Sequence, residues 1–252
     1  MNQKTLSLLI LLFLTKITAY SQLIFTVNGV SFTMISVEGG TFTMGATSEQ
    51  GEEADNDEKP AHSVKLSNYH IGKTEVTREL WHAVMGNNPA TFKGSKRPVE
   101  RVSWNDCQEF IIKLNSLTGQ SFRLPTEAEW KFAARGGNNS HGYKYAGSNC
   151  LNKVAWYWEN SHSETHEVAT KSPNELGIYD MSGNVWEWCQ DWYDENYYNS
   201  DSQSNSQESS SVFNRVFRGG GANDDIDCCR IADRLDTGQD SRGDYLGLRL
   251  AL

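Results

Sequence analysis

The chain has 252 residues, of which 38% are hydrophobic and 22% are charged, as expected for one large globular domain or two small ones. Its formal net charge is −9, and no cluster of lysine and arginine in the sequence would neutralise phosphate groups. This balance argues against nucleic acid as a partner and disfavours binding to anionic membrane surfaces.

The amino-terminal residues carry the features of a secretory leader. An early lysine is followed by an apolar run over residues 6–14, and then by the small residues Ala19 and Ser21. This pattern predicts a signal peptide over residues 1–21, followed by a linker over residues 22–31. A membrane anchor is the alternative, but a spanning helix needs about 20 apolar residues. We therefore expect a secreted, periplasmic or cell-surface protein that does not insert into the membrane after cleavage.

Two helices are predicted in the first half of the chain. Thr77 is suited to cap the first, which should end before Gly86. Ser103 precedes the second, in which apolar residues recur with helical spacing over residues 107–114. Gly119 then provides a stop for this second helix.

A third helix is predicted after Thr126, because Thr126 and Glu129 have the spacing of a capping box and Gly136 provides a stop. After Gly137 we find no further strong helix. Short strand-like runs such as KVAWYW alternate with Asn, Gly, Ser and Asp, so this half should be rich in loops.

The stretch DENYYNSDSQSNSQESSS, residues 194–211, has too few apolar side chains to form a core. It is predicted to be a solvated surface loop within a single domain. A domain boundary here is the alternative. However, only about 40 residues follow, and chains of that length rarely fold alone without metals or disulfides.

Seven phrases occur in order between residue 35 and the carboxyl terminus: ISVEGGTFTMGA, GKTEVTRELW, RPVERVSWNDCQEF, RLPTEAEWKFAARGG, GIYDMSGNVWEWCQDWY, RVFRGG and LGLRLAL. Together they resemble the formylglycine-generating enzyme family, also called sulfatase-modifying factors. The resemblance implies one α+β domain over residues 32–252, loop-rich, with a C-type-lectin-like fold and little regular secondary structure.

The resemblance also implies a structural calcium site in the turn GIYDMSGNVWEW. Asp180 and Glu187 would bind through carboxylates, and Gly183 and Val185 through backbone carbonyls. Hard oxygen ligands of this kind suit calcium. The alternative is a turn whose carboxylates are simply solvated.

Enzymes of this family bind copper through two cysteines spaced C-x4-C near the carboxyl terminus, and they use oxygen to convert a sulfatase cysteine to formylglycine. In the equivalent segment the only cysteines here are the adjacent Cys228 and Cys229. Two neighbouring thiols are poorly arranged to approach a soft metal from different sides. The sequence therefore argues against copper and against catalysis, with formylglycine-generating oxidase activity as the alternative. A structural role for Cys229, paired with Cys189, is a further hypothesis.

A non-enzymatic branch of the fold, the variable proteins of diversity-generating retroelements, is mutated in this same segment at template adenines, so that the affected codons end in C or T. Between Gly219 and Tyr245 there is no Lys, Glu, Met or Trp, and every residue except Gln239 has a codon of that kind. The alternative is an ordinary polar loop. The composition favours a ligand-binding protein with a variable carboxyl-terminal surface, although a structural cell-envelope component is a further alternative.

The predicted ligand is a protein or a glycan on a surface, held by loop side chains on a rigid frame. The many aspartates of the segment favour a basic or cation-bridged partner. The residues predicted to contact the ligand are Gly221, Ala222, Asp224, Asp225, Ile226, Asp227, Cys228, Ile231, Asp233, Leu235, Asp236, Thr237, Asp240, Ser241, Asp244 and Tyr245.

Overall fold

The computed structural model describes residues 21–52, 54–195 and 213–252. The predicted signal peptide, apart from its last residue, and residues 196–211 of the predicted polar loop lie outside these described parts. None of the helices within them is long and apolar enough to cross a membrane.

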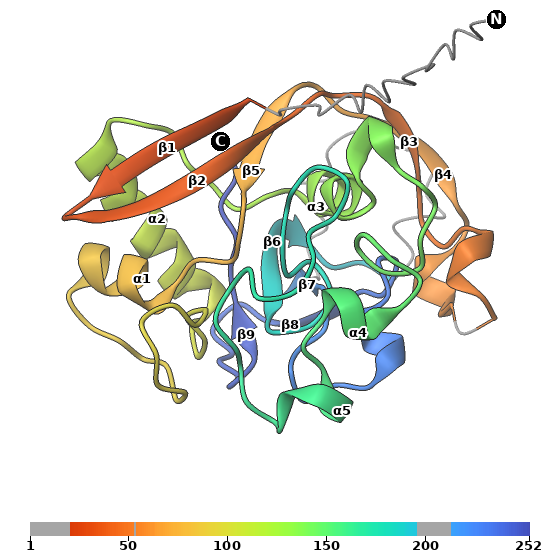
Figure 1. Ribbon diagram of the computed structural model, residues 1–252. Coiled ribbons are helices and arrows are strands. Elements are labelled where there is room, and N and C mark those ends of the chain that lie inside the picture. Colours follow the sequence, from red (N-terminus) through yellow and green to blue (C-terminus); the bar gives the residue numbers. More distant parts are fainter. Residues whose placement is uncertain (1–20, 53, 196–212) are drawn as a thin grey trace, which may run out of the picture.

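Short helices and three small sheets make up the α+β fold, and long connections join them (Figure 1). The strands are β1 (Gln22–Val27), β2 (Val30–Val37), β3 (Thr41–Met44), β4 (His62–Lys65), β5 (Tyr69–Gly72), β6 (Trp186–Trp192), β7 (Asn214–Arg218), β8 (Leu235–Gly238) and β9 (Leu246–Gly247). The sheets have the strand orders β1-β2-β5, β3-β4 and β8-β7-β6-β9, and β9 runs parallel to β6.

The three helices predicted from sequence are confirmed as α1 (Arg78–Met85), α2 (Trp104–Thr118) and α3 (Glu127–Ala134). The hydroxyls of Thr77, Ser103 and Thr126 each accept a hydrogen bond from the backbone N–H three residues on. These caps satisfy N–H groups that have no partner inside the helix. The other helices in the described parts of the chain are single turns, namely α4 (Leu151–Val154), α5 (Trp158–Ser161) and the 3₁₀ turns η1 (Ser48–Gln50), η2 (Asn56–Glu58), η3 (Gly137–Asn139) and η5 (Ile226–Cys229).

Two sequence expectations differ from the structure. Residues 22–31 are not a linker, because β1 pairs with β2 in register from Gln22 opposite Ile35 to Val27 opposite Val30. The ring of Phe25 packs on Phe32 within this hairpin, which supplies the apolar contacts that a linker would lack. The run KVAWYW is not a strand, since its first two residues belong to α4.

Two large apolar clusters form the core. The first joins α1 and α2 to the β1–β2 hairpin, and in it the ring of Trp81 stacks on Phe110 at 4.9 Å between centroids. The second surrounds α3, whose Trp130 is fully buried. Figure 1 shows α3 near the centre of the molecule beside β6 and β7, so this helix is positioned to hold the carboxyl-terminal segment.

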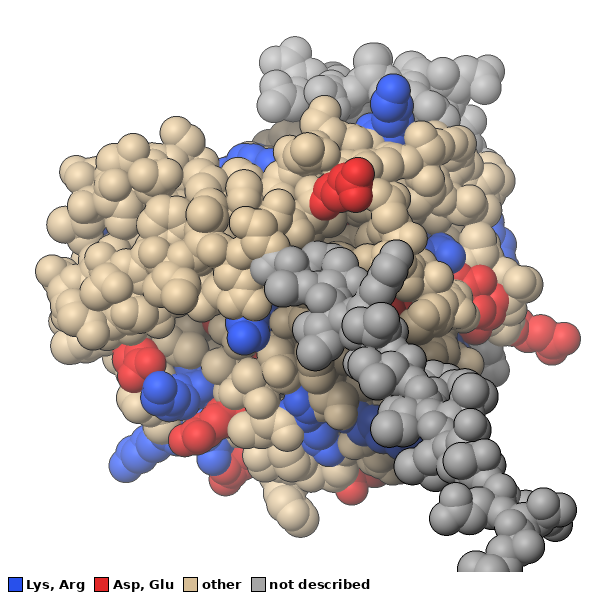
Figure 2. All heavy atoms as spheres, turned by 45° about the horizontal axis from the view of Figure 1, so that its top comes forward, with Lys and Arg blue, Asp and Glu red and all other residues tan. Residues whose placement is uncertain are grey.

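The outer surface in Figure 2 is uneven in charge. Uncharged side chains cover the β1–β2 end of this face, while acidic and basic side chains are interspersed along its lower edge. Ile24, on β1, is 69% exposed, because β1 is an edge strand of its sheet.

Candidate binding surface

The carboxyl-terminal segment, residues 219–245, leaves the end of β7, makes the turn η5 and returns as β8 beside β7. The backbone N–H of Gly183 donates to the carbonyl of Gly219 at 2.7 Å, which fixes the start of the segment to the turn before β6. The hydroxyl of Tyr245 donates to the carbonyl of Ser163 at 2.6 Å, which fixes its end. Both ends of the segment are therefore held by the body of the domain.

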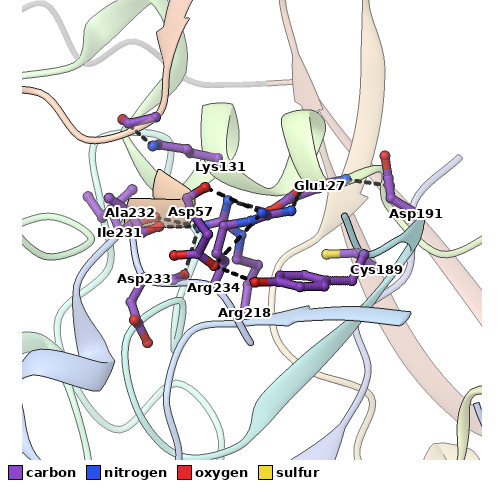
Figure 3. Close-up of polar contacts among 12 residues, drawn as sticks. Asp57, Glu127, Lys131, Cys189, Asp191, Arg218, Ile231, Ala232, Asp233 and Arg234 are labelled. Carbon is purple, nitrogen blue, oxygen red and sulfur yellow. Dashed lines mark hydrogen bonds and ion pairs between the residues drawn. The ribbon is translucent and has the colours of Figure 1, made fainter. Parts of the chain in front are cut away.

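A buried ion-pair network holds the middle of the segment (Figure 3). Glu127, the first residue of α3, accepts from Arg218 at 2.5 Å and from Nε of Arg234 at 2.7 Å. All three side chains are almost completely buried. Burial alone would raise the pKa of Glu127, but the charges of Arg234 and Arg218 outweigh it and lower this pKa to about 2.

Arg218 also binds the backbone of the segment directly. Its Nη1 donates to the carbonyls of Ala232 at 2.6 Å and Asp233 at 2.7 Å. Arg230 adds a second buried pair, since its two terminal nitrogens donate to the two carboxylate oxygens of Glu58 at 2.7 and 3.0 Å. Residues 230–234 are thus a rigid frame rather than a display loop.

The structure divides the sixteen residues that were predicted to contact a ligand. Four of them are buried, six are half-buried and six are exposed. The buried ones are Gly221, Ala222, Ile231 and Asp233. The half-buried ones are Asp224, Cys228, Asp236, Thr237, Ser241 and Tyr245. The exposed ones are Asp225, Ile226, Asp227, Leu235, Asp240 and Asp244.

The four buried residues lie beneath the surface, where a macromolecular ligand on the outside of the domain does not reach their side chains. The N–H of Ala222 donates to the carbonyl of Asn184 at 2.9 Å, and its carbonyl accepts from the hydroxyl of Ser161. A side chain at Gly221 would meet Cβ of Tyr245 at 2.8 Å. Ile231 packs in the core cluster around α3.

Several of the remaining aspartates have structural partners. The carboxylate of Asp224 accepts from the indole N–H of Trp186 at 2.6 Å and from the backbone N–H of Gly221 at 2.9 Å. Asp236 accepts from Asn214 at 2.6 Å, and Asp240 accepts from Asn105 at 2.6 Å. These contacts bind the segment to its surroundings and leave less of its charge available to a partner.

The most prominent exposed group lies at the turn that begins with Asn223. Asp225, Ile226 and Asp227 follow it, and Ile226 is 45% exposed although it is aliphatic. Trp158 of α5 lies beside this turn, since its N–H donates to the carbonyl of Asp224 at 3.0 Å, and it is 57% exposed. We call these five residues the tip. Trp158 was not among the predicted contacts, because it is the last residue of the strand-like run KVAWYW.

The two adjacent cysteines occupy different environments. Cys228 is half-buried and packs against the cluster that contains Trp186, whereas Cys229 is fully buried in a small cluster with Tyr145 and Leu151. Burial, reinforced by nearby aspartates, raises the pKa of the Cys228 thiol to about 12. Burial likewise raises the pKa of Cys229 well above its ordinary value. In the metal-free protein, burial and the nearby aspartates therefore favour the thiol over the thiolate, which is the form that binds metals.

All five cysteines are free, so the hypothesis that Cys189 pairs with Cys229 was wrong. Cys189 is buried in the cluster around α3, and Cys229 is buried in the separate cluster formed with α4. The two phrases that carry them are close in the fold, but their side chains enter different parts of the core.

In the turn predicted to bind calcium, the structure gives both carboxylates protein partners. Glu187 is fully buried, with Oε1 2.6 Å from Arg249 and Oε2 2.6 Å from the indole nitrogen of Trp130. Asp180 accepts from the N–H of Ala169 at 2.7 Å. Calcium held by Asp180, Gly183, Val185 and Glu187 remains a prediction, and it would require Glu187 to exchange partners.

A family model described as the sulfatase-modifying factor enzyme 1-like domain matches residues 26–252. The chain is 37% identical over 214 residues to chaperone protein LppX of Paenibacillus barcinonensis, which covers 65% of this chain and 73% of that protein. It is 28% identical to a formylglycine-generating enzyme of Streptomyces coelicolor, covering 86% and 88% of the two chains. The solved structure of Treponema denticola variable protein 1 is similar with a TM-score of 0.76 and 34% identity, covering 91% of this chain and 98% of that one.

Proposed function

The chain belongs to the sulfatase-modifying factor enzyme 1-like family, and from this premise we propose that it is an exported, non-catalytic binding protein that presents its carboxyl-terminal segment to a protein or glycan ligand. The relatives of the chain include a chaperone protein and a formylglycine-generating enzyme, so membership alone does not decide between catalysis and binding. The proposal rests on what this chain's own segment can do chemically.

The observation that carries the proposal is the contrast within the segment. Residues 230–234 are held by buried ion pairs, whereas the tip presents side chains that are exposed. A rigid frame with exposed loop side chains is the arrangement that tolerates sequence change without loss of fold. The similarity to Treponema denticola variable protein 1, over nearly all of that chain, supports the same interpretation.

The alternative, copper-dependent oxidation, is disfavoured by the cysteines. A copper site of two thiolates needs both sulfurs to reach one ion, whereas Cys228 and Cys229 pack in different apolar clusters. Export is supported by the leader pattern of residues 1–21.

We expect the purified protein to retain no equimolar Cu(I) after gel filtration, and to leave a cysteine-containing sulfatase peptide unchanged by mass spectrometry under oxygen. The double variant Cys228→Ala, Cys229→Ala should behave identically, because neither thiol has a metal to lose. Equimolar copper in the wild type, together with aldehyde in the peptide, would contradict the non-catalytic proposal.

A comparison of gene sequences across sibling isolates tests the variable surface. We expect differences to gather at Asn223, Asp225, Ile226 and Asp227, where exposed side chains can change at little cost, and each should map to an adenine in a near-copy of the segment. The codons of residues 229–234 should stay constant, because these side chains are buried. An invariant tip with no near-copy beside the gene would reject diversification and leave a cell-envelope scaffold as the function to test.

A further inference from the structure

A group of three carboxylates lies outside the predicted calcium turn, at the junction of η2 and the carboxyl-terminal segment. One carboxylate oxygen from each of Asp55, Glu58 and Asp233 lies within 4.8 Å of the other two. Within the described parts of the chain, this is the one group of three or more His, Cys, Asp or Glu side chains that meets this distance. The residues are far apart in sequence, so the fold brings them together.

Asp233 provides an independent indication of a ligand. The residue is 6% exposed, and its Oδ2 is buried and accepts no hydrogen bond. A buried carboxylate oxygen without a partner is costly, because it has lost its water without gaining a donor. A cation that binds the Asp233 carboxylate through both oxygens would satisfy it.

The charges of the group leave room for a divalent ion. In their ionised forms Asp55, Glu58 and Asp233 carry three negative charges, and Arg230 contacts two of them, Glu58 and Asp233. Arg230 is bound through both of its terminal nitrogens to Glu58, and it lies 3.6 Å from Oδ1 of Asp233. The contacts of Arg230 leave Oδ2 of Asp233 available, and the side chain of Asp55, which accepts from the backbone N–H of Glu58 in the cap of η2, has further acceptor positions.

We propose that Asp55, Glu58 and Asp233 bind a calcium ion that links η2 to the carboxyl-terminal segment. Calcium accepts carboxylates in irregular geometry and completes its shell with water, which the exposed side of Asp55 admits. Magnesium demands near-octahedral geometry and dehydrates reluctantly, so it suits this partly buried group less well. The site does not depend on the binding function proposed above.

The expected consequence is a cross-link within the frame of the segment. The neighbouring Arg230 and Arg234 already attach residues 230–234 to η2 and α3. A calcium ion on Asp233 would add an attachment at the same place, and it would stabilise the folded chain by mass action. Asp233, predicted from sequence to contact a ligand, becomes an anchor of the frame instead.

The test is calorimetric titration of CaCl2 into EDTA-treated, dialysed full-length protein after leader removal, with thermal unfolding measured in parallel. Wild-type protein should bind calcium and unfold at a higher temperature in its presence. Asp233→Asn should weaken binding at least tenfold, since a charged ligand is lost. Thermal unfolding of Asp233→Asn without calcium gives the baseline for this variant, and added calcium should raise its unfolding temperature less than it raises that of wild type.

Two controls distinguish this site from others. Asp227→Asn changes an exposed aspartate of the same segment and should bind calcium as wild type does. Asp180→Asn changes the predicted calcium turn, and it should still bind calcium at the group formed by Asp55, Glu58 and Asp233. The proposal is overturned if calcium neither binds nor stabilises the wild type. It is equally overturned if Asp233→Asn binds calcium with wild-type affinity. Loss of all calcium binding in Asp180→Asn, with normal binding in Asp233→Asn, would place the ion in the predicted calcium turn instead.

Discussion

Replacement of Arg218 by methionine is expected to lower the free energy of unfolding by about 3–5 kcal/mol, the range for breaking a buried ion pair. Methionine keeps much of the side-chain volume but removes one of the two guanidinium groups that neutralise Glu127. It also removes the donors to the backbone carbonyls of Ala232 and Asp233, which lie in a buried stretch. Urea unfolding at neutral pH measures the change.

The matched control is Arg242→Met. Arg242 donates to Asp106 at 2.7 Å, in a geometry like that of the buried pairs, but its side chain is 51% exposed. Exposed pairs contribute about 0–1 kcal/mol, because water screens them and side-chain entropy opposes them. Equal losses in Arg218→Met and Arg242→Met would show that the buried network does not hold the segment.

Replacement of Gly183 by alanine is expected to cost about 3–5 kcal/mol, since left-handed strain adds to overpacking. Gly183 has a φ of +79°, which L side chains rarely adopt. A methyl group there would lie 2.3 Å from the carbonyl oxygen of Trp156. This oxygen is part of the backbone and accepts a hydrogen bond from the N–H of Asn184, so it is not free to move away. Thermal or urea unfolding should show this loss of stability. The hydrogen bond from the N–H of Gly183 to the carbonyl of Gly219 should be disturbed as well.

Gly177→Ala isolates the contribution of backbone strain. Its φ is +78°, nearly equal to that of Gly183, but a methyl group there meets no atom within 4 Å. The expected cost is therefore only the strain of about 1–2 kcal/mol. If the two variants lost the same stability, close packing between the turn and Trp156 would be refuted as the cause.

Together these variants test the physical basis of a binding surface that can change. The tip is free to vary only if the frame beneath it is stable without it. Arg218 holds the frame from the side of α3, and Gly183 holds the first residue of the segment through its N–H. Such a scaffold should lose stability in Arg218→Met and in Gly183→Ala, but it should keep its stability when Asp225 or Ile226 is substituted.

Local signals in the sequence predicted the helices well. Thr77, Ser103 and Thr126 cap helices because the hydroxyl, the first N–H groups and the following apolar spacing all lie within a few residues. The strand over residues 22–27 was mistaken for a linker because its pairing with β2 and the packing of Phe25 on Phe122 come from other parts of the chain. A strand at the edge of a sheet carries little local signal of its own.

The sequence located the segment that carries the candidate surface. It did not show which side chains of that segment are exposed. Ala222 and Cys228 were both predicted from the sequence to contact a ligand. In the structure, the backbone of Ala222 is hydrogen-bonded to Ser161 and Asn184, and Cys228 packs against the first core cluster. The neighbours that decide burial come from α5, β6 and the turn before it.

The sequence by itself determined the family, the α+β class, the three capped helices and the position of the candidate surface, because these depend on ordered motifs and short-range spacing. Only the tertiary structure decided which aspartates are exposed, which cysteines are buried and where Asp55 and Glu58 meet Asp233. Burial, charge pairing and pKa depend on atoms that lie close in space but far apart in the chain, and a one-dimensional pattern does not record such distances.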